Sequence, residues 1–168
     1  MANYLNDRAF QKAISYIIQH EESGYISNLN EKGGETKYGI SKRAYPAVDI
    51  KNLSLEDAKK IHYIDHWLKN KCHFMPTYEL ALKLLSLSIN VGSLKAGRLV
   101  QRALRGFGRM LIEDGVINAQ TLDVINNVDP HMLLMALKSE AAGYYRLLAE
   151  IQPTKKRLIS GWLNRAYN

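Results

Sequence analysis

The sequence predicts a mainly α-helical fold with a small loop-rich or β-hairpin insertion after the first helix. Three observations indicate this class. Apolar residues recur at helical spacing over most of the chain. Residues 23–46 interrupt this pattern with four glycines and short alternations that suit turns or a hairpin. No long linker, repeat or low-complexity tract divides the 168 residues, which predicts one compact domain.

The first helix is expected to begin after Asn6 or Asp7, either of which can cap its first turn. Its apolar stripe consists of Phe10, Ala13, Ile14, Ile17 and Ile18. The helix should end near Glu21 or Glu22, where the glycine-rich stretch begins.

A second helix is expected to start at Ser54, because Asp57 three residues later completes a pattern that resembles a capping box. It should run to Leu68 and carry Tyr63 and Trp67, of which Trp67 suits the core.

Thr77 can cap a third helix that is apolar on all sides between Leu80 and Val91, as expected of a central buried helix. The same run is interrupted by Lys83 and three further polar residues, and it is shorter than the roughly 20 residues that span a bilayer. We therefore expect no transmembrane segment.

Ser93 can start a fourth helix whose basic residues point outward; they are Lys95, Arg98, Arg102 and Arg105. Further helices are expected at 121–126, from Asp129-Pro130 onward, and after Pro153.

The chain is basic, with 23 Lys and Arg against 16 Asp and Glu, a net charge of +7 and a pI near 9.4. Such a charge favours polyanionic partners: nucleic acid, anionic lipid or a bacterial cell wall. Cys72 is the single cysteine, so no intramolecular disulfide can form, and we expect a half-buried thiol. The first residues lack a basic stretch followed by an apolar one, so we expect no cleavable secretory signal.

Glu22 is the candidate catalytic residue. It follows the apolar stripe of the first helix and precedes an open loop, where desolvation can keep a carboxyl protonated near neutral pH. By spacing alone, an exposed glutamate in the last helical turn is the commoner case.

The surrounding motifs point further. Glu22-Ser23-Gly24-Tyr25, followed by 33–40 as GGETKYGI, resembles the E-G-G-Y and D-P-G-G-x-T-x-x-G-I signature of glycoside hydrolase family 108. The resemblance continues through Tyr63 and Trp67. It extends over Ser88-Ile89-Asn90-Val91-Gly92, Ala96-Gly97-Arg98, Gln101, Asp114-Gly115-Val116-Ile117 and Gln120-Thr121.

This resemblance implies a lysozyme-like N-acetylmuramidase that cleaves the β-1,4 bond between N-acetylmuramic acid and N-acetylglucosamine of peptidoglycan. It places the general acid at Glu22. Ser23 replaces a glycine of the motif, and residues 27–32 lack both aspartates and both prolines of the usual N-D-P-x-D-P segment. Glu31 and Thr36 match the acid and threonine spacing of phage lysozymes, so Glu31 is the candidate second carboxylate and Thr36 the candidate water-orienting hydroxyl. The expected sugar-binding residues are Tyr25, Asn28, Tyr38, Tyr63 and Asn90.

Two other functions remain open at this point. His62 and His66 have an i, i+4 spacing that suits a zinc hydrolase, although two surface histidines are the simpler reading. A wall-binding protein without catalysis would explain the altered loop. Nucleic-acid binding is disfavoured, because no aromatic residues interleave the arginines from Arg98 to Arg109 in the manner of a recognition surface.

We thus expect residues 1–92 to form the catalytic part and 93–168 a helical peptidoglycan-binding part packed on it. The expected partners are glycan strands and the anionic cell envelope, and we expect a monomer with no metal or cofactor. The expected role is that of a phage or prophage endolysin with bacteriolytic, antimicrobial action. It would be made in the cytoplasm and reach the periplasm and cell wall through a holin-type lesion.

Overall fold

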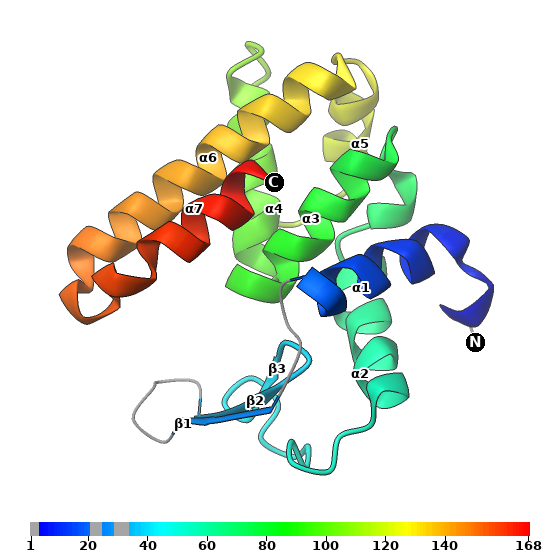
Figure 1. Cartoon of the computed structure of the whole chain (residues 1–168). Helices are drawn as coiled ribbons and strands as arrows, with labels where there is room; N and C mark the ends of the chain where they lie inside the picture. Colours follow the sequence, from blue (N-terminus) through cyan, green and yellow to red (C-terminus); the bar gives the residue numbers. More distant parts are fainter. Residues whose placement is uncertain (1–3, 21–24, 29–33) are drawn as a thin grey trace.

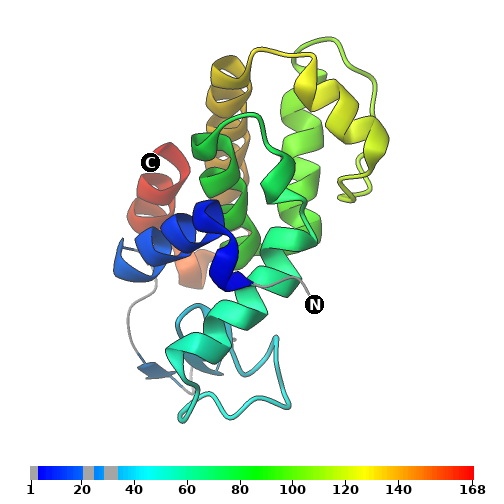
Figure 2. The same cartoon turned by 90° about the vertical axis from the view of Figure 1, so that its right-hand side faces the viewer.

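The computed structural model describes residues 4–20, 25–28 and 34–168 of the chain. Its α-helices are α1 (Arg8–His20), α2 (Leu55–His62), α3 (Tyr78–Val91), α4 (Ser93–Arg105), α5 (Ala119–Asn126), α6 (Pro130–Ile151) and α7 (Ile159–Tyr167). Short 3-10 segments are Tyr4–Asn6, Cys72–Phe74 and Pro153–Leu158. The helices form a body with a small sheet below it (Figure 1), and the same arrangement is visible after a quarter turn (Figure 2). The predicted mainly α class with an insertion after the first helix is confirmed.

Asp7 supplies the cap of α1, one of the two residues predicted for this role. Its Oδ1 accepts a hydrogen bond from the Phe10 amide at 2.9 Å, and its Oδ2 accepts one from Trp67 Nε1 at 2.8 Å. One carboxylate therefore starts α1 and anchors the core indole that follows α2. The residues of the apolar stripe on α1 are buried, except Ile18, which is partly buried.

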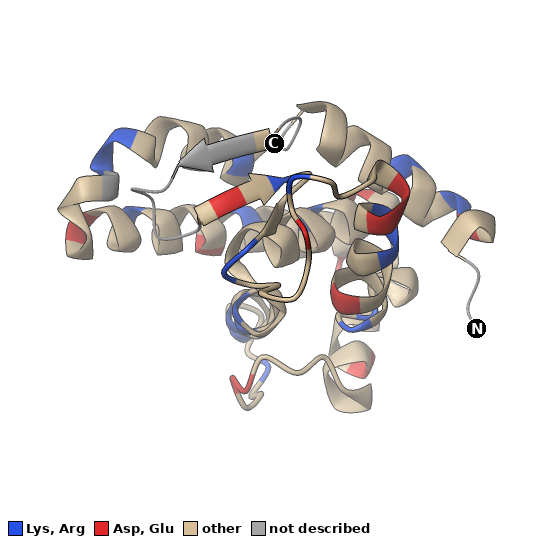
Figure 3. Cartoon of the chain, turned by 90° about the horizontal axis from the view of Figure 1, so that it is seen from below, with Lys and Arg blue, Asp and Glu red and all other residues tan. Residues whose placement is uncertain are grey.

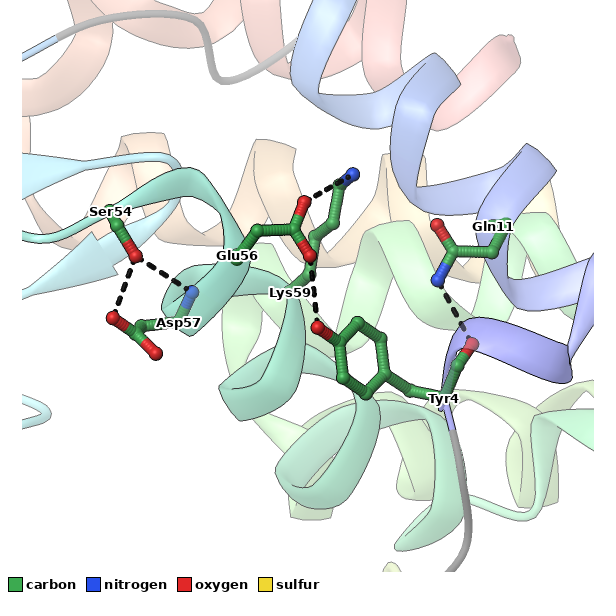
Figure 4. Close-up of polar contacts among 6 residues, drawn as sticks. All are labelled: Tyr4, Gln11, Ser54, Glu56, Asp57 and Lys59. Atoms are coloured by element: carbon green, nitrogen blue, oxygen red, sulfur yellow. Dashed lines mark hydrogen bonds and ion pairs between the residues drawn. The ribbon is translucent and has the colours of Figure 1, made fainter.

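The 3-10 turn at the start of the described chain is tied to α2 by polar contacts (Figure 4). Tyr4 Oη donates to Glu56 Oε2 at 2.9 Å, and Gln11 Nε2 donates to the Tyr4 carbonyl at 2.9 Å. In the same view, Ser54 Oγ accepts from the Asp57 amide at 3.1 Å and donates to Asp57 Oδ2 at 2.6 Å. The predicted cap of α2 is thus confirmed.

The insertion is an antiparallel sheet of β1 (Tyr25–Asn28), β2 (Gly34–Lys37) and β3 (Ile40–Ser41), in the order β1-β2-β3. The β2–β3 turn is tight, with Tyr38 and Gly39 both at positive φ of 52° and 76°. Ile40 is fully buried in a small apolar cluster with Ile50, Leu53 and Ala58. Since Ala58 belongs to α2, this cluster holds the sheet against the helical body.

After α2 the chain continues in a π-helical turn, η2 (Tyr63–Leu68). The predicted continuation to Leu68 is thus observed, but with wider winding. π-helical turns are rare and often occur at functional sites.

Helix α3 packs against α1, α4 and α6, which makes it the central helix that the sequence predicts. Thr77 caps it by accepting from the Leu80 amide at 3.3 Å. Lys83 is a buried cation on this helix, and its Nζ donates to the carbonyls of Arg165 at 2.6 Å and Ala166 at 3.2 Å. The lysine therefore satisfies the last carbonyls of α7, where a positive charge also complements the helix dipole.

Helix α4 and the loop before α5 approach at backbone distance. A Cβ built on Gly97 would lie 2.0 Å from the Gly115 carbonyl oxygen. The buried Gln101 holds the same loop, because its Nε2 donates to Asp114 Oδ1 at 2.8 Å and its Oε1 accepts from the Gly115 amide at 2.8 Å. The basic residues predicted to point outward on α4 are exposed.

Helix α6 starts at Asp129-Pro130 as predicted, with Asp129 Oδ1 accepting from the Met132 amide at 2.9 Å. Helices α6 and α7 lie side by side (Figure 1), and Tyr145 of α6 stacks on Trp162 of α7. One main core includes residues of α1, η2, α3, α4, α5, α6 and α7, whereas Ala58 of α2 belongs to the small cluster under the sheet. Cys72 lies within this core and is 1% exposed, so the prediction of a half-buried thiol is wrong; burial raises the pKa of the Cys72 thiol. None of the helices in the described ranges is both long and apolar enough to cross a membrane.

Candidate active site

A hollow of about 760 Å³ lies between the sheet, the π-helical turn and the junction of α3 with α4. We call it the inner hollow. Its lining consists of Gly39, Ser41, Arg43, Ala44, Tyr45, Asp65, His66, Lys69, Ile89, Asn90, Val91, Gly92, Ser93, Leu94 and Lys95. A cavity of this size and mixed polarity suits a polar oligomeric ligand.

The sheet turns one of its faces toward the inner hollow. Ser41, which lines the hollow, is the direct partner of Thr36 in the β2–β3 register, so the two side chains share a face. Tyr25 is paired with Lys37, the neighbour of Thr36, and therefore belongs to the other face. There Tyr25 Oη donates to Glu35 Oε1 at 2.7 Å. Thr36 thus shares the sheet face of Ser41 without itself lining the hollow, and Tyr25 lies on the other face.

A network of polar side chains forms the floor of the inner hollow. Tyr45 Oη donates to Asp65 Oδ2 at 2.9 Å, and burial together with this bond raises the pKa of Tyr45. His66 Nδ1 lies 2.8 Å from Ser88 Oγ, and Ser93 Oγ donates to the Asp65 carbonyl at 2.7 Å. These contacts join the loop after β3, the π-helical turn, α3 and the first residue of α4, so they fix the relative position of the hollow's walls.

His62 and His66 are 1% and 9% exposed, so the expectation of two surface histidines is wrong. The wider π-helical winding and the packing of the sheet on α2 enclose them. His62 Nε2 lies 2.7 Å from the Tyr38 carbonyl, to which it donates, while its Nδ1 is buried without a hydrogen-bond partner among the described residues. The described part of the chain holds no group of three His, Cys, Asp or Glu side chains arranged for a metal ion.

Burial lowers the pKa of His62 to about 4 and that of His66 to about 3, the latter also through the nearby His62 and Lys69 charges. Both values lie below the ordinary 6.5, so the unfolded chain binds more protons than the folded chain as pH falls below that value. The free energy of unfolding should therefore fall between pH 7 and pH 5, by about 2 kcal/mol for each histidine.

Urea unfolding at pH 7, 6 and 5 measures this loss. The exposed His131 replaced by glutamine serves as the control, because this side chain lies outside the buried pair. An unfolding free energy that stays constant from pH 7 to pH 5 would contradict the assignment of two neutral buried histidines.

The other predicted site residues are distributed unevenly. Asn90 lines the inner hollow, and its Nδ2 donates to the Ser86 carbonyl at 2.9 Å. The backbone carbonyl of Tyr38 accepts the hydrogen bond of His62. The Tyr38 side chain is partly buried and packs beside the small cluster under the sheet. Tyr63 is 7% exposed and packs edge-on against Phe10 in the core, so the structure does not bring it to the hollow.

Three further predicted site residues lie outside the described residues or next to a gap in them. Glu22 and Glu31, the two candidate carboxylates, lie outside the described residues. Asn28 is the last residue of β1, where its backbone pairs with Gly34.

Several residues of the hollow were not predicted from the sequence. Tyr45, Asp65 and Ser93 come from three separate elements and meet only through the fold. His66 was expected at the surface, and Lys95 was expected to point outward from its helix. Neither Arg43 nor Asp65 was predicted to line a cleft.

The mainly helical body with its small sheet is a lysozyme-like fold, and the inner hollow lies between its two parts. Residues 14–92 match the family described as Glycosyl hydrolase 108, and residues 95–167 match the one described as Predicted Peptidoglycan domain. Residues 14–92 belong to glycoside hydrolase family 108, and a peptidoglycan domain follows them in the same chain. The protein is a peptidoglycan hydrolase, and its place of action is therefore the cell wall.

The fold has a clear counterpart among solved structures. The chain is similar to Brucella abortus SagA, with a TM-score of 0.75 and 21% sequence identity over 94% of this chain and 93% of that chain. At this identity the likeness describes the fold. Among curated proteins no relative matches the chain.

Proposed function

We propose that the protein is an N-acetylmuramidase that hydrolyses the β-1,4 bond between N-acetylmuramic acid and N-acetylglucosamine, with Glu22 as general acid. The observation that carries the proposal is the position of Thr36. It is on the sheet face that borders the inner hollow, beside Ser41, in a segment that follows the Glu22 motif in the family pattern. Among the residues predicted to be catalytic, it is the one that the structure describes.

In this mechanism Glu22 protonates the glycosidic oxygen as the bond to the departing sugar breaks. The apolar, buried face of α1 that precedes it favours a carboxyl that remains protonated near neutral pH. Glu31 then stabilises positive charge on the remaining sugar or activates the attacking water, and the Thr36 hydroxyl orients that water. Where Glu31 only stabilises charge, the Glu22 carboxylate takes the proton of the attacking water and the acid is regenerated directly. Where Glu31 activates the water, Glu31 takes that proton, and exchange with solvent returns Glu31 to its carboxylate and Glu22 to its acid form.

The glycan would lie in the inner hollow. Asn28 and Tyr38 are proposed to contact it from the sheet and its turn, and Asn90 from the end of α3. Tyr63 supports the site from the core, since it packs on Phe10. Tyr25 is bonded to Glu35 on the sheet face opposite Thr36, and this bond favours a role for Tyr25 in holding the strands in place.

We further propose that residues 1–92 carry the catalysis, and that 93–168 form a helical peptidoglycan-binding part packed on them. The matched ranges 14–92 and 95–167 support this division. A monomeric phage or prophage endolysin is the proposed role. It would be made in the cytoplasm and released to the periplasm through a holin-type lesion, and its basic surface would speed its encounter with the anionic envelope.

The test is the chemical identity of the new chain ends. Purified peptidoglycan is digested, the products are reduced with borohydride, and they are identified by mass spectrometry. A muramidase gives reduced N-acetylmuramic acid ends. Reduced N-acetylglucosamine ends would instead assign the other glycosidic bond, and 1,6-anhydro ends would show that no water enters; either product contradicts the proposal.

A further inference from the structure

A second hollow of about 360 Å³ adjoins the inner hollow, and we call it the outer hollow. Arg43, Asn90, Val91 and Lys95 line both. The remaining wall of the outer hollow comes from α6 and α7, including Tyr144, Tyr145 and Trp162. The two hollows therefore share a wall at the junction of α3 with α4, and we call the pair the groove.

The groove crosses from one matched segment into the other. Its inner part lies within residues 14–92, apart from the first turn of α4, and its outer part is walled by residues of the segment 95–167. The peptidoglycan domain is thus not a separate anchor beside the catalytic part. It supplies one end of the same binding surface.

The wall shared by the two hollows is held in place. Asn90 Nδ2 donates to the Ser86 carbonyl at 2.9 Å, and Arg165 of α7 donates to Asn90 Oδ1 at 3.2 Å. Gly92, between α3 and α4, has a φ of +88°. In the outer hollow, Tyr145 and Trp162 stack with their ring centroids 5.5 Å apart, which gives a rigid aromatic wall.

The outer hollow has the charge of an anion site. Arg43 and Lys95 stand at the shared wall, and among the described residues that line the outer hollow none is acidic. Lys95 Nζ donates to Tyr144 Oη at 3.3 Å, an exposed contact that a charged acceptor can replace. The single carboxylate of the inner hollow, on Asp65, already accepts a hydrogen bond from Tyr45. Seen from below, the loop that follows β3 carries basic segments in blue and one acidic segment in red (Figure 3).

Peptidoglycan has a component next to the glycan whose chemistry matches the outer hollow. It is the short peptide on muramic acid, which carries carboxylates and small apolar side chains. We propose that the outer hollow binds this carboxylate-bearing peptide while the inner hollow holds the glycan. The inference rests on the proposed function. It adds that the enzyme prefers peptide-bearing strands, because Arg43 and Lys95 in the wall shared by the two hollows bind the peptide carboxylates.

Binding of two soluble probes tests this without any bond cleavage. The probes are the disaccharide N-acetylglucosaminyl-N-acetylmuramic acid with its tetrapeptide, and the same disaccharide after the peptide has been removed by an amidase. Titration calorimetry should show that the unsubstituted protein binds the peptide-bearing probe at least about tenfold more tightly, as charge-assisted hydrogen bonds allow. Lys95→Gln combined with Arg43→Gln should bring the ratio of the two affinities to within about twofold of one. The ratio is the readout because both residues also line the inner hollow, so the double substitution can weaken binding of both probes.

Arg98→Gln is the matched control, because it removes one positive charge from the same exposed side of α4 but lies outside the lining of both hollows. It should preserve the preference. Equal binding of the two probes by the unsubstituted protein would overturn the proposal, as would a preference that survives the double substitution or is lost equally in Arg98→Gln. Neither probe contains the bond from N-acetylmuramic acid to N-acetylglucosamine that the proposed function assigns. Mass spectrometry of the probes after titration shows whether their remaining bond, from N-acetylglucosamine to N-acetylmuramic acid, has been cut. Cut probes contradict the proposed function, whereas the affinity ratio measured on intact probes tests the peptide site, so the two proposals can fail separately.

Discussion

Gly97→Ala is expected to destabilise the protein by about 3 kcal/mol or more. The added Cβ would lie 2.0 Å from the Gly115 carbonyl oxygen and 2.7 Å from the Gly115 carbonyl carbon, so it would collide with backbone and not with a flexible side chain. Relief requires the loop to move away from α4. That movement would break the bonds by which the buried Gln101 holds Asp114 and Gly115.

Gly143→Ala provides the control for this substitution. Gly143 lies inside α6 with no atom within 4 Å of an added Cβ, so alanine there should stabilise the helix by roughly 0.5 to 1 kcal/mol. Urea unfolding of the two variants and the unsubstituted chain gives the comparison. A Gly97→Ala chain as stable as the unsubstituted one would contradict the close approach of α4 and the loop.

The same contact explains why two distant motifs occur together in the sequence. Gly115 has a φ of +84°, and a Cβ on it would lie 2.2 Å from the Leu94 carbonyl oxygen. Each glycine thus makes room for the other segment, and Gln101 bonds to the backbone that they bring near. We therefore attribute the motifs 96–98 and 114–117 to the packing of α4 against the loop and not to catalysis.

Local signals predicted the helices well, because a cap depends on residues three positions apart. Asp7, Ser54, Thr77 and Asp129 each bond to the amide that the sequence pattern indicates. The glycines and short alternations likewise predicted the insertion. The turn at Tyr38 and Gly39 requires positive φ angles, which is a local property of the backbone.

Contacts between distant segments could not be predicted in this way. His66 is buried because Ser88, 22 residues later, offers a partner and because the π-helical turn directs it inward. Lys83 read as a polar interruption of an apolar helix, and only the end of α7, more than 80 residues further on, gives it carbonyl partners.

The candidate site shows the same division. Thr36 was predicted from its spacing, and the strand register places it on the face that borders the hollow. Tyr63 was assigned to the cleft from its residue type, but helical packing directs it to the core beside Phe10. Arg43 and Lys95 lie 52 positions apart, and they meet in one groove only because β3, α3 and α4 converge.

The account depends most on Glu22 as the general acid. An amide has nearly the shape of the carboxyl group but cannot give a proton to the leaving oxygen. Glu22→Gln should therefore lower the rate of bond cleavage by about a thousandfold or more, while the stability of the chain and its binding of peptidoglycan change little.

Glu35→Gln is the matched control. Glu35 is an acid on β2, bonded to Tyr25 on the sheet face opposite Thr36, so its loss should change the rate by only a few-fold, within the range of a modest change in strand stability. Both variants are first compared by urea unfolding, which separates loss of chemistry from loss of folding.

The deciding measurement is the initial rate at which reducing N-acetylmuramic acid ends appear from purified peptidoglycan with the unsubstituted protein, Glu22→Gln and Glu35→Gln. The account predicts release by the unsubstituted protein and by Glu35→Gln, and almost none by a folded Glu22→Gln. Full release by Glu22→Gln would contradict the mechanism.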